Sequence, residues 1–470
     1  MRSALVGLGL VAFVPPAFAE EPPADEPPAD PPPIDENALF GGSSPVDEAA
    51  LFGGDPAAPA PDTSSTSDAG IAQTLDTLDR RLEFGGQLWL QAQTSFVENT
   101  EPGAATLNSP NVFDLFADAR PNDRVRVYAR TRVTSDFTIE AGDTDFAGNP
   151  LVQTRVTLDQ MWIKGDIDKK VFVTLGYQRI KWGTGRFWNP TDYLNVVFNP
   201  LSVFDVRTGV PLLKFHVPVE SAGLNFYGIV APRGARRLDD VGGALRAEWF
   251  HGSTEITLST YLQKDQPLRL GGDLSTAVGP FDVRVESAVM KGTLRPYYEG
   301  DLDLGNLTFP TEKDRSDEWI PQVDANAEIS IKYNDEDVVS FGAEYFYNGA
   351  GYDGSEIYPW LLLNNAFQVF YLGRHYGVGY VRLADPGKVE DMSFTASVLS
   401  NLSDQSAALR FDWRWTALSY LNLNAFAQGH VGQTGELRFG LDIPPMPGLE
   451  DGLVVERPVL DVGLGAQVSF

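Results

Sequence analysis

The chain has 470 residues, with 36 Lys and Arg against 64 Asp and Glu, a formal net charge of −28 and no cysteine. This acidic balance argues against a nucleic-acid partner, and the lack of cysteine excludes disulfides, thiolate metal sites and covalent haem attachment. Half of the charge excess lies in residues 20–79, which hold 14 acidic residues and no Lys or Arg.

Residues 1–19 predict a cleaved secretory signal peptide. Arg2 supplies the positive end, residues 4–14 form a short apolar core, and Ala17-Phe18-Ala19 is a small-x-small cleavage site. No stretch of the chain after it approaches the ~20 apolar residues that a transmembrane helix requires. If the mature chain sits in a membrane, it must therefore do so as a closed barrel.

Residues 20–70 are rich in proline, alanine and acidic side chains, a composition that predicts a disordered periplasmic tail. The tail carries one pattern twice, as Leu39-Phe40-Gly41-Gly42 and Leu51-Phe52-Gly53-Gly54. One hypothesis is a linear motif that docks in the groove of a periplasmic partner. The alternative is a duplicated spacer that binds nothing.

Residues 71–81 place Ile71, Leu75 and Leu78 at helical spacing and predict a short helix. It would lead into the next domain or, alternatively, plug the periplasmic mouth of a barrel.

From Leu82 to Phe470 the chain is a succession of alternating segments. Within 322–334 the odd-numbered residues are apolar and the even-numbered ones polar, and 408–416 and 458–470 alternate in the same way. A tilted strand crosses a bilayer in ~9–11 residues. We therefore predict an all-β fold, a transmembrane antiparallel up-and-down β-barrel of about 16–18 strands over 82–470. The alternative for the last strand is a soluble β-sandwich.

Four arginines share one face of a single predicted strand over 124–134, namely Arg124, Arg126, Arg130 and Arg132. Acids across the lumen are expected to face them, with Asp282, Glu286, Asp324, Glu328, Glu344 and Asp412 as candidates. Such an arrangement would create a transverse field at a constriction. The alternative is a set of salt bridges that rigidify the wall.

A segment over 176–207 mixes aromatic, charged and glycine residues in a way that predicts a loop folded into the lumen. Its candidate constriction residues are Arg179, Lys181, Trp182, Arg186, Trp188, Asp192, Asp205 and Arg207. The alternative is an element that anchors a lid without touching solute.

Two stretches of this segment resemble porin-like outer-membrane proteins of Gram-negative bacteria. They are Gly176-Tyr177-Gln178-Arg179-Ile180-Lys181-Trp182-Gly183 and Asn189-Pro190-Thr191-Asp192, which match a Gly-x-Gln-x-Ile-x-Trp-Gly and Asn-Pro-x-Asp pattern. The resemblance implies a barrel of this kind and carries no substrate. The terminal Phe470 also resembles the signature by which barrel-assembly machinery reads the last strand.

Catalysis has little support in the sequence. The four histidines, His216, His251, His375 and His430, lie on separate predicted strands and show no metal-binding spacing. His216 with Ser221 would suit a hydrolase, but we interpret the histidines as interior hydrogen-bonding residues. Acidic loops at 301–303 and 335–337 would bind divalent cations that bridge lipopolysaccharide, or remain solvated. We expect no enzyme activity, no cofactor and no metal site.

The leading hypothesis is an outer-membrane, porin-like channel for passive diffusion of small polar or charged solutes. Its expected partners are outer-membrane lipid, lipopolysaccharide and the assembly machinery. The alternative is a barrel occluded by its loops that serves as an envelope scaffold or surface interaction protein.

Overall fold

The computed structural model describes residues 81–99, 101–143, 150–195, 209–303, 305–306, 308–334, 337–387, 389, 391–443 and 452–470. The predicted signal peptide, the tail with its two repeats and residues 71–80 of the predicted helix lie outside this part of the chain, as do Asp205 and Arg207.

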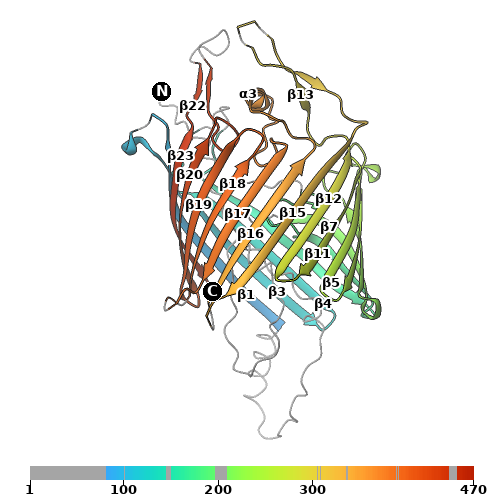
Figure 1. Cartoon of the computed structure of the whole chain (residues 1–470). Coiled ribbons are helices and arrows are strands. Elements are labelled where there is room, and N and C mark those ends of the chain that lie inside the picture. Colours follow the sequence, from blue (N-terminus) through green and yellow to red (C-terminus); the bar gives the residue numbers. More distant parts are fainter. Residues whose placement is uncertain are drawn as a thin grey trace.

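Eighteen antiparallel strands form one closed barrel (Figure 1). In chain order they are β1 (Leu82–Val97), β3 (Pro110–Asn122), β4 (Val125–Asp136), β5 (Thr154–Ile167), β6 (Val171–Gln178), β7 (Val210–Val219), β8 (Leu224–Ala231), β9 (Gly242–His251), β10 (Thr254–Leu262), β11 (Arg269–Val278), β12 (Phe281–Lys291), β15 (Trp319–Lys332), β16 (Val338–Asn348), β17 (His375–Ala384), β18 (Met392–Asn401), β19 (Ser406–Leu418), β20 (Leu421–Gly432) and β23 (Pro458–Ser469). Each pairs with its neighbours in sequence, and β23 closes the barrel against β1. The predicted up-and-down barrel is confirmed.

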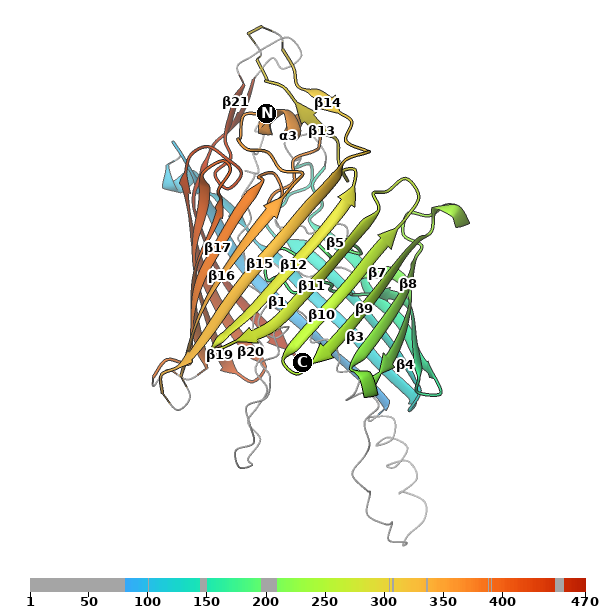
Figure 2. The same cartoon turned by 45° about the vertical axis from the view of Figure 1, so that its right-hand side comes forward.

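Smaller elements extend from one end of the barrel. They are η1 (Pro102–Ala104), β2 (Thr106–Asn108), η3 (Leu238–Asp240), the hairpin β13 (Tyr297–Glu299) and β14 (Thr311–Lys313), α3 (Tyr358–Leu363), and the hairpin β21 (Leu441–Ile443) and β22 (Leu453–Val455). Figure 2 shows α3, β13, β14 and β21 gathered beyond the upper rim. Among the described helices, none combines the length and the apolar character needed to cross a membrane.

The connections are short at one end of the barrel and long at the other. Residues 123–124 join β3 to β4, residues 252–253 join β9 to β10, and η2 (Glu220–Ala222) turns the chain between β7 and β8. The C-terminus lies at this same, lower end (Figure 1). The connections from β6 to β7, β12 to β15, β16 to β17 and β20 to β23 are long, and they leave and re-enter the barrel at the opposite end.

One strand is shorter than its sequence pattern. The pattern over 368–383 is typical of a single strand, but β17 starts only at His375. Phe370 has a φ of +69°, which no regular strand adopts, and both Phe370 and Leu372 are buried in an apolar cluster of loop and strand residues. The apolar residues before His375 are therefore explained by packing within the loop, although their pattern in the sequence is also typical of a strand.

The outer surface of the barrel is apolar. Phe84, Leu258, Leu464 and Phe470 each expose more than 60% of their surface. A continuous exposed apolar surface of this extent belongs in lipid. The outer wall therefore fits an outer-membrane location, with β23 spanning the layer as its alternating pattern predicted.

Candidate functional site

The inner face of the barrel is lined by polar and charged side chains. On β15, Asp324, Asn326 and Glu328 are buried while Ala327 between them is exposed. Other buried charged residues of the wall are Asp114, Asp118, Arg130, Arg132, Asp159, Lys164, Arg246, Arg269, Asp273, Arg284, Glu286, Glu344, Arg410 and Asp461. Successive side chains of a strand point to opposite faces, so the pattern that makes the outside apolar also makes the inside polar.

A β-bulge in β5 anchors both ends of the long segment between β6 and β7. The β4–β5 register skips Asp159, whose carboxylate accepts a hydrogen bond from Arg179 Nη2 at 2.5 Å. The backbone carbonyl of Asp159 accepts another from Gly209 N–H at 3.0 Å. A Cβ at Gly209 would approach that oxygen to 2.2 Å, which explains the glycine. One extra residue in the wall thus holds the segment where it leaves and where it returns.

The middle of this segment is bound to a buried carboxylate of β12, Glu286. Backbone N–H groups of Thr184, Gly185 and Thr191 donate to Glu286 at 2.9, 3.3 and 2.5 Å, and the Thr191 hydroxyl donates at 2.8 Å. Gly183 has a φ of +92°, and a Cβ there would lie 2.5 Å from Glu286 Oε2. The glycines of the Trp-Gly-x-Gly stretch therefore allow the backbone to approach the carboxylate closely.

A second carboxylate, Glu344 on β16, binds the next turn of the segment. The consecutive backbone N–H groups of Arg186, Phe187 and Trp188 donate to it at 3.1, 2.9 and 2.9 Å. The Arg186 side chain pairs with Glu328 of β15. Consecutive N–H groups form a concavity that binds anions, and here the anion is the Glu344 carboxylate of the barrel wall. The described part of the segment, residues 179–195, therefore lies inside the barrel against β12, β15 and β16.

The other predicted residues of this segment differ in their surroundings. Trp182 is buried, packs edge to face against Tyr193 at 6.1 Å between ring centroids, and lies below the Arg246 guanidinium at 5.5 Å. Asp192 accepts two hydrogen bonds from Asn195 at 2.9 Å. Lys181 is exposed. Arg179, Trp182, Arg186 and Trp188 are predicted residues that contact the wall.

The four arginines predicted on one strand face are not all on the strand. Arg124 is exposed in the turn before β4, and its backbone N–H donates to Asn122 Oδ1 at 2.9 Å. An asparagine that bonds the backbone two residues on forms a turn. The predicted strand 124–134 therefore began one residue too early, and only Arg126, Arg130 and Arg132 lie on β4.

Two of these arginines pair with the neighbouring strand. Arg132 Nε and Nη2 donate to the two oxygens of Asp114 at 2.7 and 2.5 Å, and Arg126 donates to both oxygens of Asp118. Asp114 stands directly opposite Arg132 in the β3–β4 register, and directly opposed residues are close enough to interact. The adjacent strand supplies these partners.

The acids expected across the lumen are therefore not the partners of Arg126 and Arg132, and that expectation was wrong. Glu286 and Glu344 accept backbone N–H groups of the inward segment, and Glu328 pairs with Arg186. Asp412 pairs with Arg410 two residues away on β19 at 2.7 Å. Salt bridges along the wall explain these two arginines, as the alternative interpretation held.

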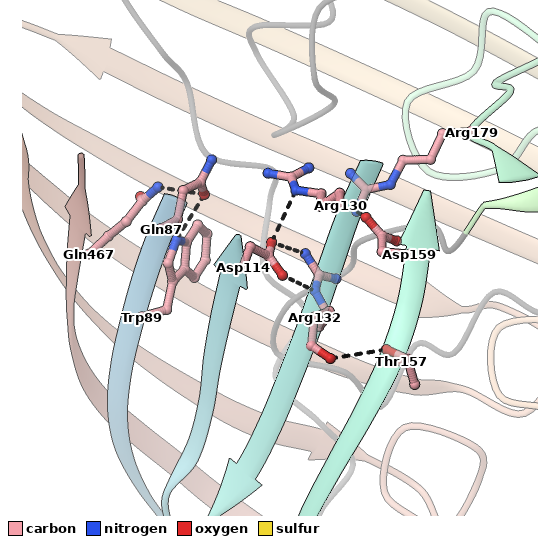
Figure 3. Close-up of polar contacts among 9 residues, drawn as sticks. All are labelled: Gln87, Trp89, Asp114, Arg130, Arg132, Thr157, Asp159, Arg179 and Gln467. Carbon is pink, nitrogen blue, oxygen red and sulfur yellow. Dashed lines mark hydrogen bonds and ion pairs between the residues drawn. The ribbon is translucent and has the colours of Figure 1, made fainter. Parts of the chain in front are cut away.

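Arg130 differs from its neighbours. Its Nε lies 3.6 Å from Asp114 Oδ2, which Arg132 already occupies, and no hydrogen bond from its guanidinium reaches another described residue. Figure 3 shows Arg130, Arg132 and Arg179 with Asp114 and Asp159. We call these five residues the arginine patch. It holds three guanidinium groups and two carboxylates.

Loops cover part of the upper mouth with an apolar cluster. Tyr358 and Leu361 of α3, Phe370 and Leu437 pack with Trp188 of the inward segment, and all are buried. The Trp188 indole N–H donates to the Phe370 carbonyl at 3.0 Å. The inward segment and the upper loops therefore share one hydrophobic core.

A buried polar network ties these loops to the rim of the barrel. Glu436 accepts hydrogen bonds from the Tyr376 hydroxyl at 2.6 Å and from Asn401 Nδ2 at 2.7 Å. Its backbone N–H donates to Asp404 at 2.7 Å, and Tyr358 lies beside Asn401. Burial, against the opposing hydrogen bond from Tyr376, raises the pKa of Glu436 to about 8.

The histidines do not assemble a catalytic centre among the described residues. His216 Nε2 bonds Asn225 at 3.0 Å, and Ser221 is exposed in η2. His430 lies inside the barrel between the Leu437 carbonyl and Asp461. His251 and His375 instead lie on the outer side beside Trp249 and Tyr345, so the expectation of interior histidines holds for two of the four. The described residues contain no group of three or more potential metal ligands.

Sequence reasoning missed the acids that matter most to the site. Asp114 and Asp118 share the inward parity of β3, the strand that precedes the arginine-bearing β4, and this signal was available in the sequence. Asp159 carried no such signal, since its role depends on a bulge. Glu436 lies in a loop where alternation says nothing about burial.

No family model and no curated protein matches the chain. Solved structures resemble its fold. A triple mutant of the Rhodopseudomonas blastica porin is 11% identical with a TM-score of 0.39, and the match covers 83% of this chain and 100% of that one. The high-pH structure of Pseudomonas putida OprB is 13% identical with a TM-score of 0.47 and covers 86% and 98%. At these identities the likeness concerns the barrel fold alone.

Proposed function

We propose that the chain forms an outer-membrane channel through which small polar or charged solutes diffuse passively. The observation that carries the proposal is the contrast between an apolar outer wall and an inner face lined by buried charges such as Arg130, Asp273 and Asp324. Ion pairs and polar side chains inside a barrel are the groups that set selectivity in a water-filled pore.

In this proposal the inward segment over 179–195 sets the width of the passage. Its support is the set of backbone hydrogen bonds to Glu286 of β12 and Glu344 of β16, together with the bond from its first residue, Arg179, to Asp159 of β5. A segment bound to several strands of the wall keeps a fixed position in the lumen, as a constriction requires.

Orientation and partners complete the proposal. The end with short turns and the C-terminus would face the periplasm, the loop-rich end the exterior, and lipid with lipopolysaccharide would surround the wall. The signal peptide would direct export, and β23 with Phe470 would be read by the assembly machinery. The two Leu-Phe-Gly-Gly repeats would hold a periplasmic partner.

The test is single-channel conductance of the purified, refolded chain in a planar bilayer, with folding verified by heat-modifiable electrophoretic mobility. Discrete openings are expected. Their conductance should increase in Glu344→Gln, which weakens the hold on the inward segment. Silence from a correctly folded barrel would overturn the channel.

A second function is favoured by the apolar cluster that joins Trp188 to the upper loops. A barrel closed by this cluster would serve as an envelope scaffold or surface interaction protein. Silence in the bilayer would support it, and so would recovery of openings in a variant that lacks residues of the loop around α3.

A further inference from the structure

The arginine patch contains one more positive charge than its carboxylates neutralise. Arg132 takes both oxygens of Asp114, and Arg179 takes Asp159 at 2.5 Å. Arg130 is left with a single contact of 3.6 Å to an oxygen that Arg132 already uses. Two carboxylates thus serve two guanidinium groups, and the third, that of Arg130, remains uncompensated.

Burial makes this surplus significant. Arg130 is only 7% exposed, and its Nε is buried without a hydrogen-bond partner among the described residues. A buried charge is ordinarily paired, because removing it from water without compensation is costly. A buried polar group with no partner calls for an explanation such as a bound ion.

The patch also matches the geometry of one ligand class. A guanidinium presents N–H groups in a planar fork that fits two oxygens of a carboxylate or phosphate. The Nε of Arg179 is buried without a partner as well, and Figure 3 shows Arg179, which directly follows β6, on the same stretch of the inner wall as Arg130 of β4. Two guanidinium groups with unused donors therefore lie on one stretch of the wall.

We propose that Arg130, supported by Arg179 and Arg132, binds a small oxyanion, a carboxylate or phosphate group, inside the barrel. The bound ion neutralises the positive charge of Arg130, which Asp114 and Asp159 leave uncompensated. The inference deepens the proposed channel function, because it names small anions as the preferred solutes, although binding itself does not require an open passage.

The test is calorimetric titration of the refolded full chain with sodium acetate and, separately, with inorganic phosphate, against sodium chloride at equal ionic strength. Wild type should bind at least one of the two oxyanions, and Arg130→Gln should weaken binding at least about tenfold. Arg126→Gln is the matched control, because it removes the same charge from the same strand but from an arginine whose Nε and Nη2 already donate to the two oxygens of Asp118. It should bind within about twofold of wild type.

Equal binding by wild type and Arg130→Gln would overturn the site, as would no oxyanion binding or an equal loss in Arg126→Gln. If Arg130→Gln fails to fold, Arg130→Lys keeps the charge and removes the fork. It should then lose the preference for oxyanion over chloride, and an unchanged preference would overturn the site. Acetate and phosphate arms distinguish carboxylate from phosphate ligands.

Bilayer recordings separate this inference from the proposed function. Open channels without oxyanion binding would defeat the site and leave the channel standing. Oxyanion binding by a folded protein that never conducts would support the site and defeat the channel.

Discussion

The lumen has two walls with opposite surpluses of charge, and they are satisfied by different means. On the β12–β16 side, Glu286 and Glu344 accept six backbone N–H hydrogen bonds from the inward segment. On the β3–β6 side, guanidinium groups outnumber carboxylates, and Arg130 has no hydrogen bond to the described residues. The excess negative charge is covered by the chain itself, whereas the excess positive charge is left for something from solution.

The difference teaches how to separate structural from functional charge in a barrel. A buried carboxylate surrounded by backbone donors fixes a loop in place, and a solute gains nothing by replacing those donors. A buried guanidinium without a partner has donors to offer.

The largest effect should come from Asp159→Asn, which removes the carboxylate that anchors Arg179. An unpaired buried arginine costs ~3–5 kcal/mol, so denaturant midpoints should fall. Hydrogen exchange at the beginning of the inward segment should accelerate. Exchange at Gly209 should change less, because its bond is to the Asp159 carbonyl. Unchanged stability would show that the bulge does not anchor the segment.

Glu344→Gln tests the role of the buried carboxylates on the β12–β16 side. Loss of charged acceptors for three N–H groups should cost ~1.5–3 kcal/mol locally and speed exchange at Arg186, Phe187 and Trp188. Glu248→Gln is the control, because among the described residues Glu248 accepts a hydrogen bond only from the Arg246 side chain, at 2.7 Å. Equal exchange in wild type and Glu344→Gln would contradict the role of backbone donors.

Asp114→Asn tests the surplus of positive charge on the β3–β6 side. It frees Arg132 beside Arg130 and adds one net positive charge to the lumen, so anion preference should increase while stability falls by ~3 kcal/mol. Reversal potentials under a salt gradient and denaturant unfolding measure the two effects. An unchanged or cation-shifted reversal potential would show that these arginines do not face the passage.

The smallest effect concerns the upper loops. The folded-state pKa of Glu436 is about 8, above its ordinary value of 4.5, so its protonated form is favoured by folding. Its stabilising contribution is complete below about pH 4.5 and is lost as the pH rises toward 8. Exchange protection of residues 433–439 should fall across that window in wild type and remain level in Glu436→Gln. A level wild-type profile would refute the assignment.

Much of the fold followed from alternation, since β15, β19 and β23 show a clean period of two that a lipid-facing strand requires. The partners of charged residues did not follow, because they depend on register. Asp114 meets Arg132 only when β3 and β4 are aligned, and Asp159 acts through a bulge that no propensity marks. The role of Glu286 and Glu344 could not be predicted either, because it depends on where the backbone of the inward segment lies.

The bulge at Asp159 has a further consequence. Because Arg179 and Gly209 both bond this one residue, the two ends of the segment between them are held at a single point of the wall. The length of the segment is therefore independent of the circumference of the barrel. A donor segment of different length could be exchanged into this barrel for residues 180–208 if it ends in the same arginine and glycine and again supplies backbone N–H groups to Glu286 and Glu344.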